Sequence, residues 1–240
     1  MNSYFTAIDS LMKEVFQEAQ SSVDEVAEEI TKRLESGGII QLFGCGHSHF
    51  IAAEPFYRGG GLVPVQPMFI ESLMLHNGAM QSSANEKDPT FFKTFEKDLD
   101  IRPEDTVIVI STSGRNPVPI DVANKAKACG AYTVSIQSLN YNGSNQPSNH
   151  PSGSRLEDVV DGILNTNVPI GDGVLNWGEL PYAPASSVIG NTLLNATISR
   201  VVELMIEKGL EPPILKSSNV SGSAEHNDRV IAKYQDRIQF

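Results

Sequence analysis

Residues 105–130 read DTVIVISTSGRNPVPIDVANKAKACG, and this stretch decides the fold. The run at 106–110 is β-branched throughout and too short for a helix, so it predicts a strand buried on both faces. Asn116 and Pro117 form a typical helix start, with Asn at the N-cap and Pro at the first helical position. Apolar residues then recur at helical spacing until Gly130. The stretch therefore predicts a strand, a turn and a helix.

The turn between this strand and this helix is crowded with hydroxyl groups. It reads Ser111, Thr112, Ser113, Gly114. Such a turn places O–H and free backbone N–H groups at the positive end of a helix dipole. It therefore predicts an anion site, and phosphate is the commonest anion with matching geometry.

An earlier unit repeats this architecture. A strand is predicted over 39–43 and a helix over 50–57, with Gly44, Cys45, Gly46, His47 and Ser48 between them. The glycines allow a sharp turn and a close approach to a ligand. Because parallel strands deliver their carboxyl ends to one edge of a sheet, the two turns are expected to form one site.

The remaining chain completes one predicted α/β domain of 240 residues, with a long amphipathic helix at 3–36, an α/β core at 37–210 and a C-terminal segment at 211–240. No second domain boundary is expected. Further predicted elements are helices at 85–99, 185–208 and 226–238, strands at 62–67, 131–137 and 157–164, and irregular stretches at 139–155 and 165–184.

Composition excludes several classes of protein. A formal net charge of −11 argues against nucleic-acid binding, which requires a basic face. No apolar run approaches the ~20 residues of a membrane span, and no secretory signal is apparent, so we expect no membrane partner. Cys45 and Cys129 form no C-x-x-C pair, and the histidines lack metal-ligand spacing, so we expect a cytoplasmic protein with no metal or cofactor.

The two turns together resemble those of the sugar isomerase (SIS) domain family. The resemblance lies in Gly44-Cys45-Gly46-His47-Ser48 and in Ser111-Thr112-Ser113-Gly114, and it covers roughly residues 25–210. The layout is most similar to stand-alone bacterial members of the sedoheptulose-7-phosphate isomerase and N-acetylmuramic acid 6-phosphate etherase types. It implies a three-layer flavodoxin-like fold with a five-stranded parallel sheet, a phosphorylated sugar as ligand, and a homodimer or homotetramer with shared active sites.

The resemblance also implies roles for individual residues in phosphosugar binding. Ser48, Ser111, Ser113 and Asn116 would hold the phosphate, the backbone of Gly46, Thr112 and Gly114 would assist, and His47 would meet a sugar hydroxyl. The alternative is that these hydroxyls and the Asn116 amide only cap helices, as such side chains often do.

Acid–base chemistry on a sugar needs a base beside an acidic C–H group and an acid for the oxygen. Glu54 is the expected base, since it lies in the helix that starts at the first turn, and etherase-like relatives also carry a Glu at about this distance; the alternative is an ion pair with Arg58, four residues on. His76, before an Asn-Gly turn, and His226, where some family members lend a histidine to a neighbour, are the expected acids. Each is otherwise an exposed residue.

Three functions remain open from the sequence. The first is a phosphosugar isomerase or related lyase, the second a non-catalytic phosphosugar sensor with the same site, and the third an assembly protein with a vestigial site. The chain matches only part of the etherase type's acidic cluster, at 83–88, and it has no histidine in the helix at 185–208, where the heptose isomerase type has one. The resemblance therefore does not choose between an isomerase and a lyase.

Overall fold

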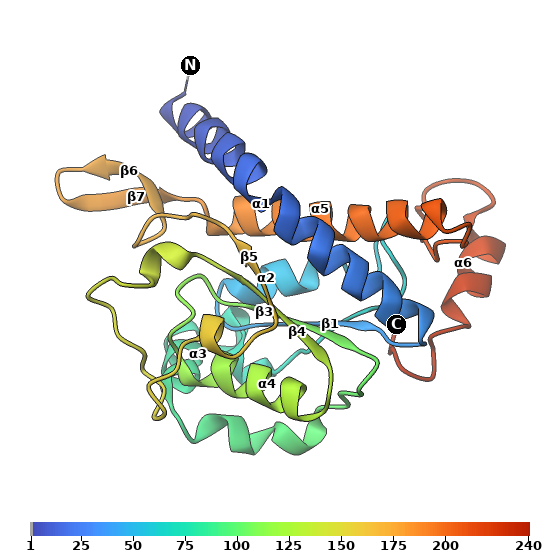
Figure 1. Ribbon diagram of the computed structural model, residues 1–240, viewed down its shortest axis with the longest axis horizontal. Coiled ribbons are helices and arrows are strands. Elements are labelled where there is room, and N and C mark those ends of the chain that lie inside the picture. Colours follow the sequence, from blue (N-terminus) through green and yellow to red (C-terminus); the bar gives the residue numbers. More distant parts are fainter. Residues whose placement is uncertain (1) are drawn as a thin grey trace.

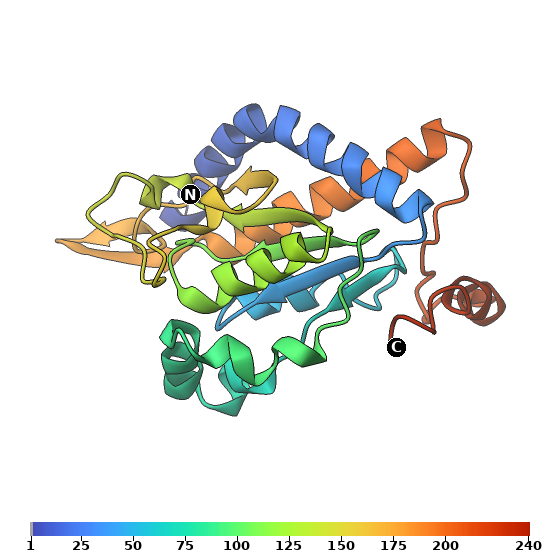
Figure 2. The ribbon, with the colours of Figure 1, turned by 60° about the horizontal axis from the view of Figure 1, so that its bottom comes forward.

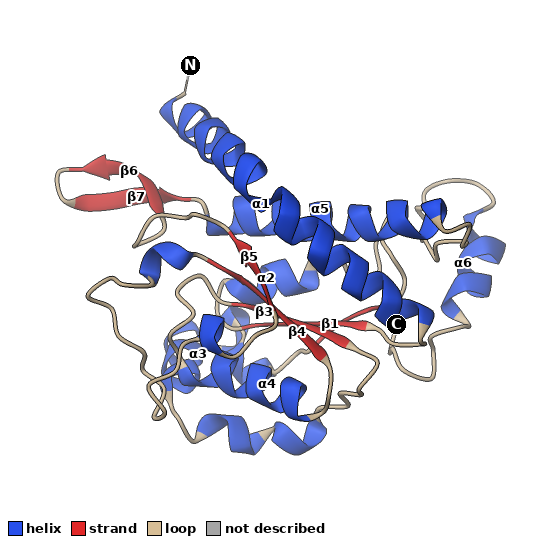
Figure 3. Ribbon diagram, viewed as in Figure 1, coloured by secondary structure: helices blue, strands red, loops and turns tan. Residues whose placement is uncertain are grey.

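A five-stranded parallel sheet in the order β2-β1-β3-β4-β5 forms the centre of the protein, for which a computed structural model describes residues 2–240 (Figure 1). This is the predicted flavodoxin-like strand order. The strands are β1 (Ile40–Gly44), β2 (Val65–Pro67), β3 (Thr106–Ile110), β4 (Tyr132–Gln137), β5 (Gly162–Asn165) and the antiparallel pair β6 (Gly173–Trp177) and β7 (Leu180–Pro184). The α-helices are α1 (Ser3–Glu35), α2 (Ser48–Ala53), α3 (Ala79–Lys87), α4 (Pro117–Ala128), α5 (Ser186–Glu207) and α6 (Ser223–Ile231). Short 3-10 helices lie at 71–73, 75–77, 91–94, 96–98, 139–141 and 156–158 (Figure 3).

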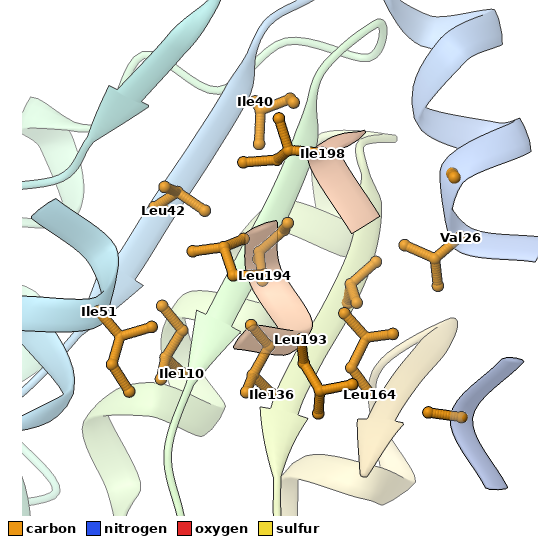
Figure 4. Packing of buried hydrophobic residues seen from close by; sticks show 14 of the residues in the cluster. Val26, Ile40, Leu42, Ile51, Ile110, Ile136, Leu164, Leu193, Leu194 and Ile198 are labelled. Atoms are coloured by element: carbon orange, nitrogen blue, oxygen red, sulfur yellow. The ribbon is translucent and has the colours of Figure 1, made fainter. Parts of the chain in front are cut away.

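Helices cover both faces of the sheet, which explains why β1 and β3 are buried along their whole length. Successive side chains of a strand point to opposite faces. Leu42 and Ile110 pack with α1, α2 and α5 in one cluster (Figure 4). Phe43 and Val109 pack with α4 and with the 3-10 segment at 91–98 in another. Figure 2 shows the sheet between α1 and α5 on one side and α4 on the other.

Strand pairing brings the two predicted turns to the same place. β1 and β3 are direct neighbours, and Gly44 at the end of β1 pairs with Ile110 at the end of β3. The turns that begin at Cys45 and Ser111 therefore leave the sheet side by side at its carboxyl edge.

The predicted helix at 85–99 is wrong in its extent. Helix α3 begins earlier, at Ala79, after Gly78 with φ +121°, and it ends at Lys87. Pro89 explains the end, because proline disfavours helical backbone in the residue before it, and Asp88 is extended with ψ 115°. The following residues form two 3-10 turns, which direct Phe92 and Phe95 into the core under β1 and β3.

Other predictions also differ from the structure. The helix predicted at 226–238 is α6, which begins at Ser223 and ends at Ile231. The strand predicted at 157–164 begins only at Gly162, since residues 156–158 form a 3-10 turn. The stretch predicted as irregular contains the β6–β7 hairpin, which projects beyond the sheet near the N-terminus of α1 (Figure 1). Its turn is Gly178-Glu179, with Gly178 at φ +61°, as two-residue hairpin loops require.

The part of the chain that the structure describes has no membrane-spanning helix, no cluster of metal ligands and no disulfide. None of the helices within residues 2–240 combines the length and the hydrophobicity that crossing a bilayer requires. The same residues include no group of three or more His, Cys, Asp or Glu side chains arranged to hold a metal ion. Cys45 and Cys129 are not paired in a disulfide.

Candidate functional site

The two turns line one cavity of about 340 Å³ at the carboxyl edge of the sheet. Helix α3 also lines it. The lining residues are Cys45, Gly46, His47, Ser48, Leu75, Ala79, Ser82, Ser83, Glu86, Ser111, Thr112, Ser113, Tyr141 and Asp172. Six of the eight residues expected to bind a phosphosugar are in this list, and Gly114 and Asn116 are not.

The first turn owes its shape to Gly46 and His49. Gly46 has φ +55°, a conformation that side chains other than glycine rarely adopt, and its N–H donates to the carbonyl of Leu73 across 2.9 Å. The buried His49 donates from Nδ1 to the Gly46 carbonyl across 2.6 Å, because a carbonyl oxygen can only accept. His49 is therefore part of the support of the turn, whereas His47 and Ser48 line the cavity.

The second turn is held from behind by β4. The N–H of Ser111 donates to the carbonyl of Ile136, and the N–H of Ser138 donates to the carbonyl of Thr112. Gly114 has φ +60°, and a Cβ added there would lie 2.4 Å from Oε1 of Gln137. Gly114 thus serves close packing against β4, which leaves the side chains of Ser111 to Ser113 on the cavity side.

Glu86 is a titratable residue of the cavity that was one of several acid–base candidates in the sequence but was not selected over Glu54. It lies in the last turn of α3 and lines the same cavity as the hydroxyl groups. Burial raises the pKa of its carboxyl group, and a hydrogen bond that Asn116 donates from Nδ2 to Oε1, at 2.8 Å, lowers it by less. No local sequence pattern marks this glutamate, because it reaches the site only through the packing of α3 against α4. The only available signal was the partial match to an acidic cluster at 83–88.

Asn116 does not cap α4 with its side chain, although it occupies the N-cap position. Its amide bonds to Glu86 and to Asn149 instead. Arg115, beside it, turns away from the cavity and donates to the carbonyl of Pro147 and to the side chains of Gln146 and Asn149.

The three expected acid–base residues lie outside this cavity in the single chain. Glu54, just after α2, forms an ion pair with Arg58 and accepts a hydrogen bond from Asn195 on α5. His76 is exposed and lies 3.5 Å from the carboxylate of Glu71. His226 lies on α6, where its Nε2 bonds to a backbone carbonyl in the preceding loop. The structure does not bring these three residues together.

The charge of the cavity comes from acids alone. Of the described residues that line it, none is a lysine or an arginine. The carboxylate of Asp172 caps the N-terminus of α5, since it accepts hydrogen bonds from the backbone N–H groups of Ala185 and Ser186. An anion in this cavity would thus be held by hydroxyl and backbone N–H dipoles rather than by an ion pair.

The sequence was compared with models of protein families and with known proteins. A family model described as the SIS domain matches residues 3–138. The "UPF0309 protein in nagA 3'region" of Lysinibacillus sphaericus is 49% identical over 240 residues, covering 100% of this chain and 98% of that protein.

Solved structures extend the comparison. A phosphoheptose isomerase from Francisella tularensis superposes with a TM-score of 0.55 at 17% identity, covering 84% of this chain and 96% of that one. The NanR protein of Vibrio vulnificus, complexed with ManNAc-6P, superposes with a TM-score of 0.51 at 14% identity, covering 97% of this chain and 66% of that one. At these identities the similarity is one of fold.

Proposed function

The chain belongs to the SIS domain family, and on that premise we propose that it binds a phosphorylated sugar in the cavity between its two turns and transfers a proton on it. The reaction is that of a phosphosugar isomerase or a related lyase. The observation that carries this proposal is that one partly buried carboxylate, Glu86, lines the same cavity as a cluster of serine and threonine hydroxyls.

The hydroxyl end of the cavity suits a phosphoryl group. Ser48, Ser111 and Ser113 offer three O–H donors, and the backbone of Gly46 and Thr112 lines the same space. Hydrogen bonds to a charged group contribute about 1.5–3 kcal/mol each. Two or three of them give useful affinity without a basic side chain. We assign the phosphate to this end of the cavity.

The carboxylate of Glu86 suits proton transfer. A carboxylate whose pKa is raised by burial is a stronger base than an exposed one, as removal of a proton from carbon requires. In an isomerase, Glu86 would take a proton from the carbon beside the carbonyl group. The C–H electron pair would form the C=C bond of an enediolate as the carbonyl π electrons move to oxygen. A proton would then pass from the neighbouring hydroxyl group to that oxygen, and Glu86 would return its proton to the former carbonyl carbon as the second oxygen becomes the new carbonyl. Among the described histidines only His47 lines the cavity, so we assign it to the sugar oxygens. Glu54, His76 and His226 take part only if a second copy brings them to this cavity.

The substitution Glu86→Gln tests this assignment. The protein is incubated in D₂O with a panel of hexose, heptose and amino-sugar 6-phosphates, and mass spectrometry follows deuterium uptake and product formation. We expect exchange with at least one member of the panel, and its loss in Glu86→Gln with binding retained. Glu28→Gln, an exposed change on α1, is the control. Exchange that persists in Glu86→Gln would remove Glu86 from the mechanism.

The alternative function is a phosphosugar sensor. The NanR protein has this fold and was solved with a phosphosugar, so the fold is compatible with phosphosugar binding in proteins other than the phosphoheptose isomerases. The same panel distinguishes the two. Binding without exchange or product in either the unsubstituted protein or Glu86→Gln would favour the sensor.

We further propose that the protein is a cytoplasmic homodimer or homotetramer. Helix α1 carries Phe5 and Phe16, whose side chains are 68% and 69% exposed, and an apolar groove runs between α1 and α5. Exposed apolar surface of this kind is typical of subunit interfaces. Sedimentation equilibrium would give the oligomeric state, and Phe16→Glu should shift it toward the monomer.

A further inference from the structure

A chain of three hydrogen bonds connects Glu86 to the protein surface. Asn116 donates from Nδ2 to Oε1 of Glu86 across 2.8 Å. Asn149 donates from Nδ2 to Oδ1 of Asn116 across 2.9 Å. Arg115 donates from a guanidinium nitrogen to Oδ1 of Asn149 across 3.0 Å. The chain thus runs from a cavity carboxylate through two amides to an arginine.

The direction of these hydrogen bonds is forced by the groups at the two ends. An ionised carboxylate only accepts hydrogen bonds, and a guanidinium only donates them. Asn116 must therefore present its NH₂ group to Glu86, which leaves its oxygen for Asn149. Asn149 must then present its own NH₂ group to Asn116 and its oxygen to Arg115. Neither amide can be flipped without placing two donors or two acceptors against each other.

We propose that Asn149 is a positioning residue for Glu86 and acts through Asn116. By donating to Asn116, it keeps the amide NH₂ of that residue directed at the carboxylate, and so it fixes both the orientation of Glu86 and its readiness to accept a proton. The inference rests on the proposed function, in which Glu86 is the base, and it adds a residue about whose role the sequence says nothing.

The loop that carries Asn149 is fastened firmly enough for this role. The backbone N–H of Asn149 donates to the carbonyl of Arg115 across 2.8 Å, and Arg115 in turn donates from Nε to the carbonyl of Pro147. The next residue, His150, bonds from Nε2 to the carboxylate of Asp121 on α4 at 3.1 Å. Asn149 is thus held on both sides, although it lies at the protein surface.

The hydrogen bond from Asn116 is one of several influences on the pKa of Glu86. Burial is the largest influence on the carboxyl group and raises its pKa, whereas the hydrogen bond from Asn116 and the charge of Lys87 lower it. The thiol of Cys45 faces Glu86 from the first turn, and His47 and Asp172 line the same cavity. The hydrogen bond from Asn116 lowers the pKa of Glu86, so weakening this bond should raise that pKa.

A ¹³C NMR titration of the Glu86 carboxyl group in the full-length protein tests the proposal without any ligand. Asn149→Ala should raise the observed pKa by about 0.5 unit or more, and Asn116→Ala by at least as much. Asn145→Ala is the matched control, because it removes an exposed amide from the same loop and should leave the titration unchanged.

Asn149→Asp gives the sharper result. A carboxylate at this position can only accept from Asn116, which would turn its NH₂ group away from Glu86 and present its oxygen instead. We expect a larger rise in the pKa of Glu86 than in Asn149→Ala. If both Asn149 variants titrate like Asn145→Ala, the positioning role is refuted.

Kinetics separate this failure from failure of the proposed function. With a phosphosugar that is turned over, the acidic limb of the kcat/KM profile should move upward in pH in the Asn149 variants, with KM nearly unchanged. A protein that binds no phosphosugar would overturn the proposed function, yet the carboxyl titration would still support or refute the link between Asn149 and Glu86.

Discussion

The backbone of Ser48 occupies the space that a side chain on Gly44 would need. A Cβ added to Gly44 would lie 2.5 Å from the carbonyl oxygen of Ser48 and 2.6 Å from its carbonyl carbon. Neither residue is free to move away, because Gly44 pairs with Ile110 in the sheet and Ser48 begins α2. The last residue of β1 thus sets how closely the first turn folds back over the strand.

Gly44→Ala should therefore damage both stability and ligand binding. Crowding of well-packed backbone typically costs about 1–3 kcal/mol, and the displaced Ser48 would no longer face the phosphate. Urea unfolding and calorimetric titration with a bound phosphosugar measure the two effects. Gly143→Ala is the comparison, since a Cβ there meets no atom within 4 Å and only the φ of +71° carries a cost, of about 1–2 kcal/mol. Unchanged affinity in Gly44→Ala would contradict the described geometry of the turn.

The ion pair between Arg155 and Glu157 should behave as a buried pair. The two side chains are 12% and 8% exposed, with Nε and Oε1 2.6 Å apart, and Arg155 also donates to the carbonyl of Ser113 in the second turn. Removing one partner of a buried pair leaves an uncompensated charge and costs about 3–5 kcal/mol. We expect Arg155→Met to lower the free energy of unfolding by an amount of this order.

The double variant Arg155→Met/Glu157→Gln provides the control for this prediction. It removes the buried charge that the single variant leaves behind, while the amide can still accept from Gln137, which now donates to Glu157 across 3.2 Å. The double variant should be more stable than Arg155→Met alone. Equal stability of the two would mean that the pair is effectively solvated.

Ser135→Ala should leave stability unchanged or raise it slightly. Ser135 lies in β4 and is fully buried, and within the described residues its hydroxyl oxygen has no hydrogen-bond partner. A buried polar group without a partner is unfavourable, so its removal relieves a cost. Thermal unfolding measures the change. A loss of more than about 1 kcal/mol would indicate a partner, such as an ordered water, that the hydroxyl group retains.

Glu86→Gln should change how stability depends on pH. Burial raises the pKa of Glu86 in the folded protein above its ordinary value of about 4.3 in the unfolded chain. The folded state thus binds more protons between these two values, and stability falls as pH rises through this window. Relative to the unsubstituted protein, Glu86→Gln should gain stability as the pH rises above about 4.3. A relative stability that is constant across this range would mean that Glu86 is not desolvated.

The parts of the fold with a local cause could be predicted from the sequence. The β-branched run at 106–110, the hydroxyl-rich turn and Pro117 each act on their own neighbours, and strand, turn and α4 occur where they are predicted. The meeting of the two turns followed from the rule that parallel strands end at one edge. The β6–β7 hairpin was missed although Gly178 marks its turn, because Pro181 and Pro184 in β7 argue against a strand.

The acid–base part of the site could not be predicted in the same way. Glu54 was preferred because it follows the first turn in sequence, but α2 directs it toward Asn195 on α5. Glu86 lies 25 residues before Ser111, and only the folding of α3 against α4 brings it to the cavity. Its pairing with Asn116 depends on tertiary structure and leaves no local pattern.

The central claim is that the two turns hold a phosphoryl group, and calorimetric titration tests it most directly. A phosphosugar that binds and its unphosphorylated parent sugar are titrated into the unsubstituted protein and into Ser111→Ala/Ser113→Ala, with Ser135→Ala as the matched control. We predict that only the phosphorylated sugar binds, that the double variant loses at least about 100-fold in affinity, and that the control binds normally. Equal binding of the free sugar, or full affinity in the double variant, would contradict the claim.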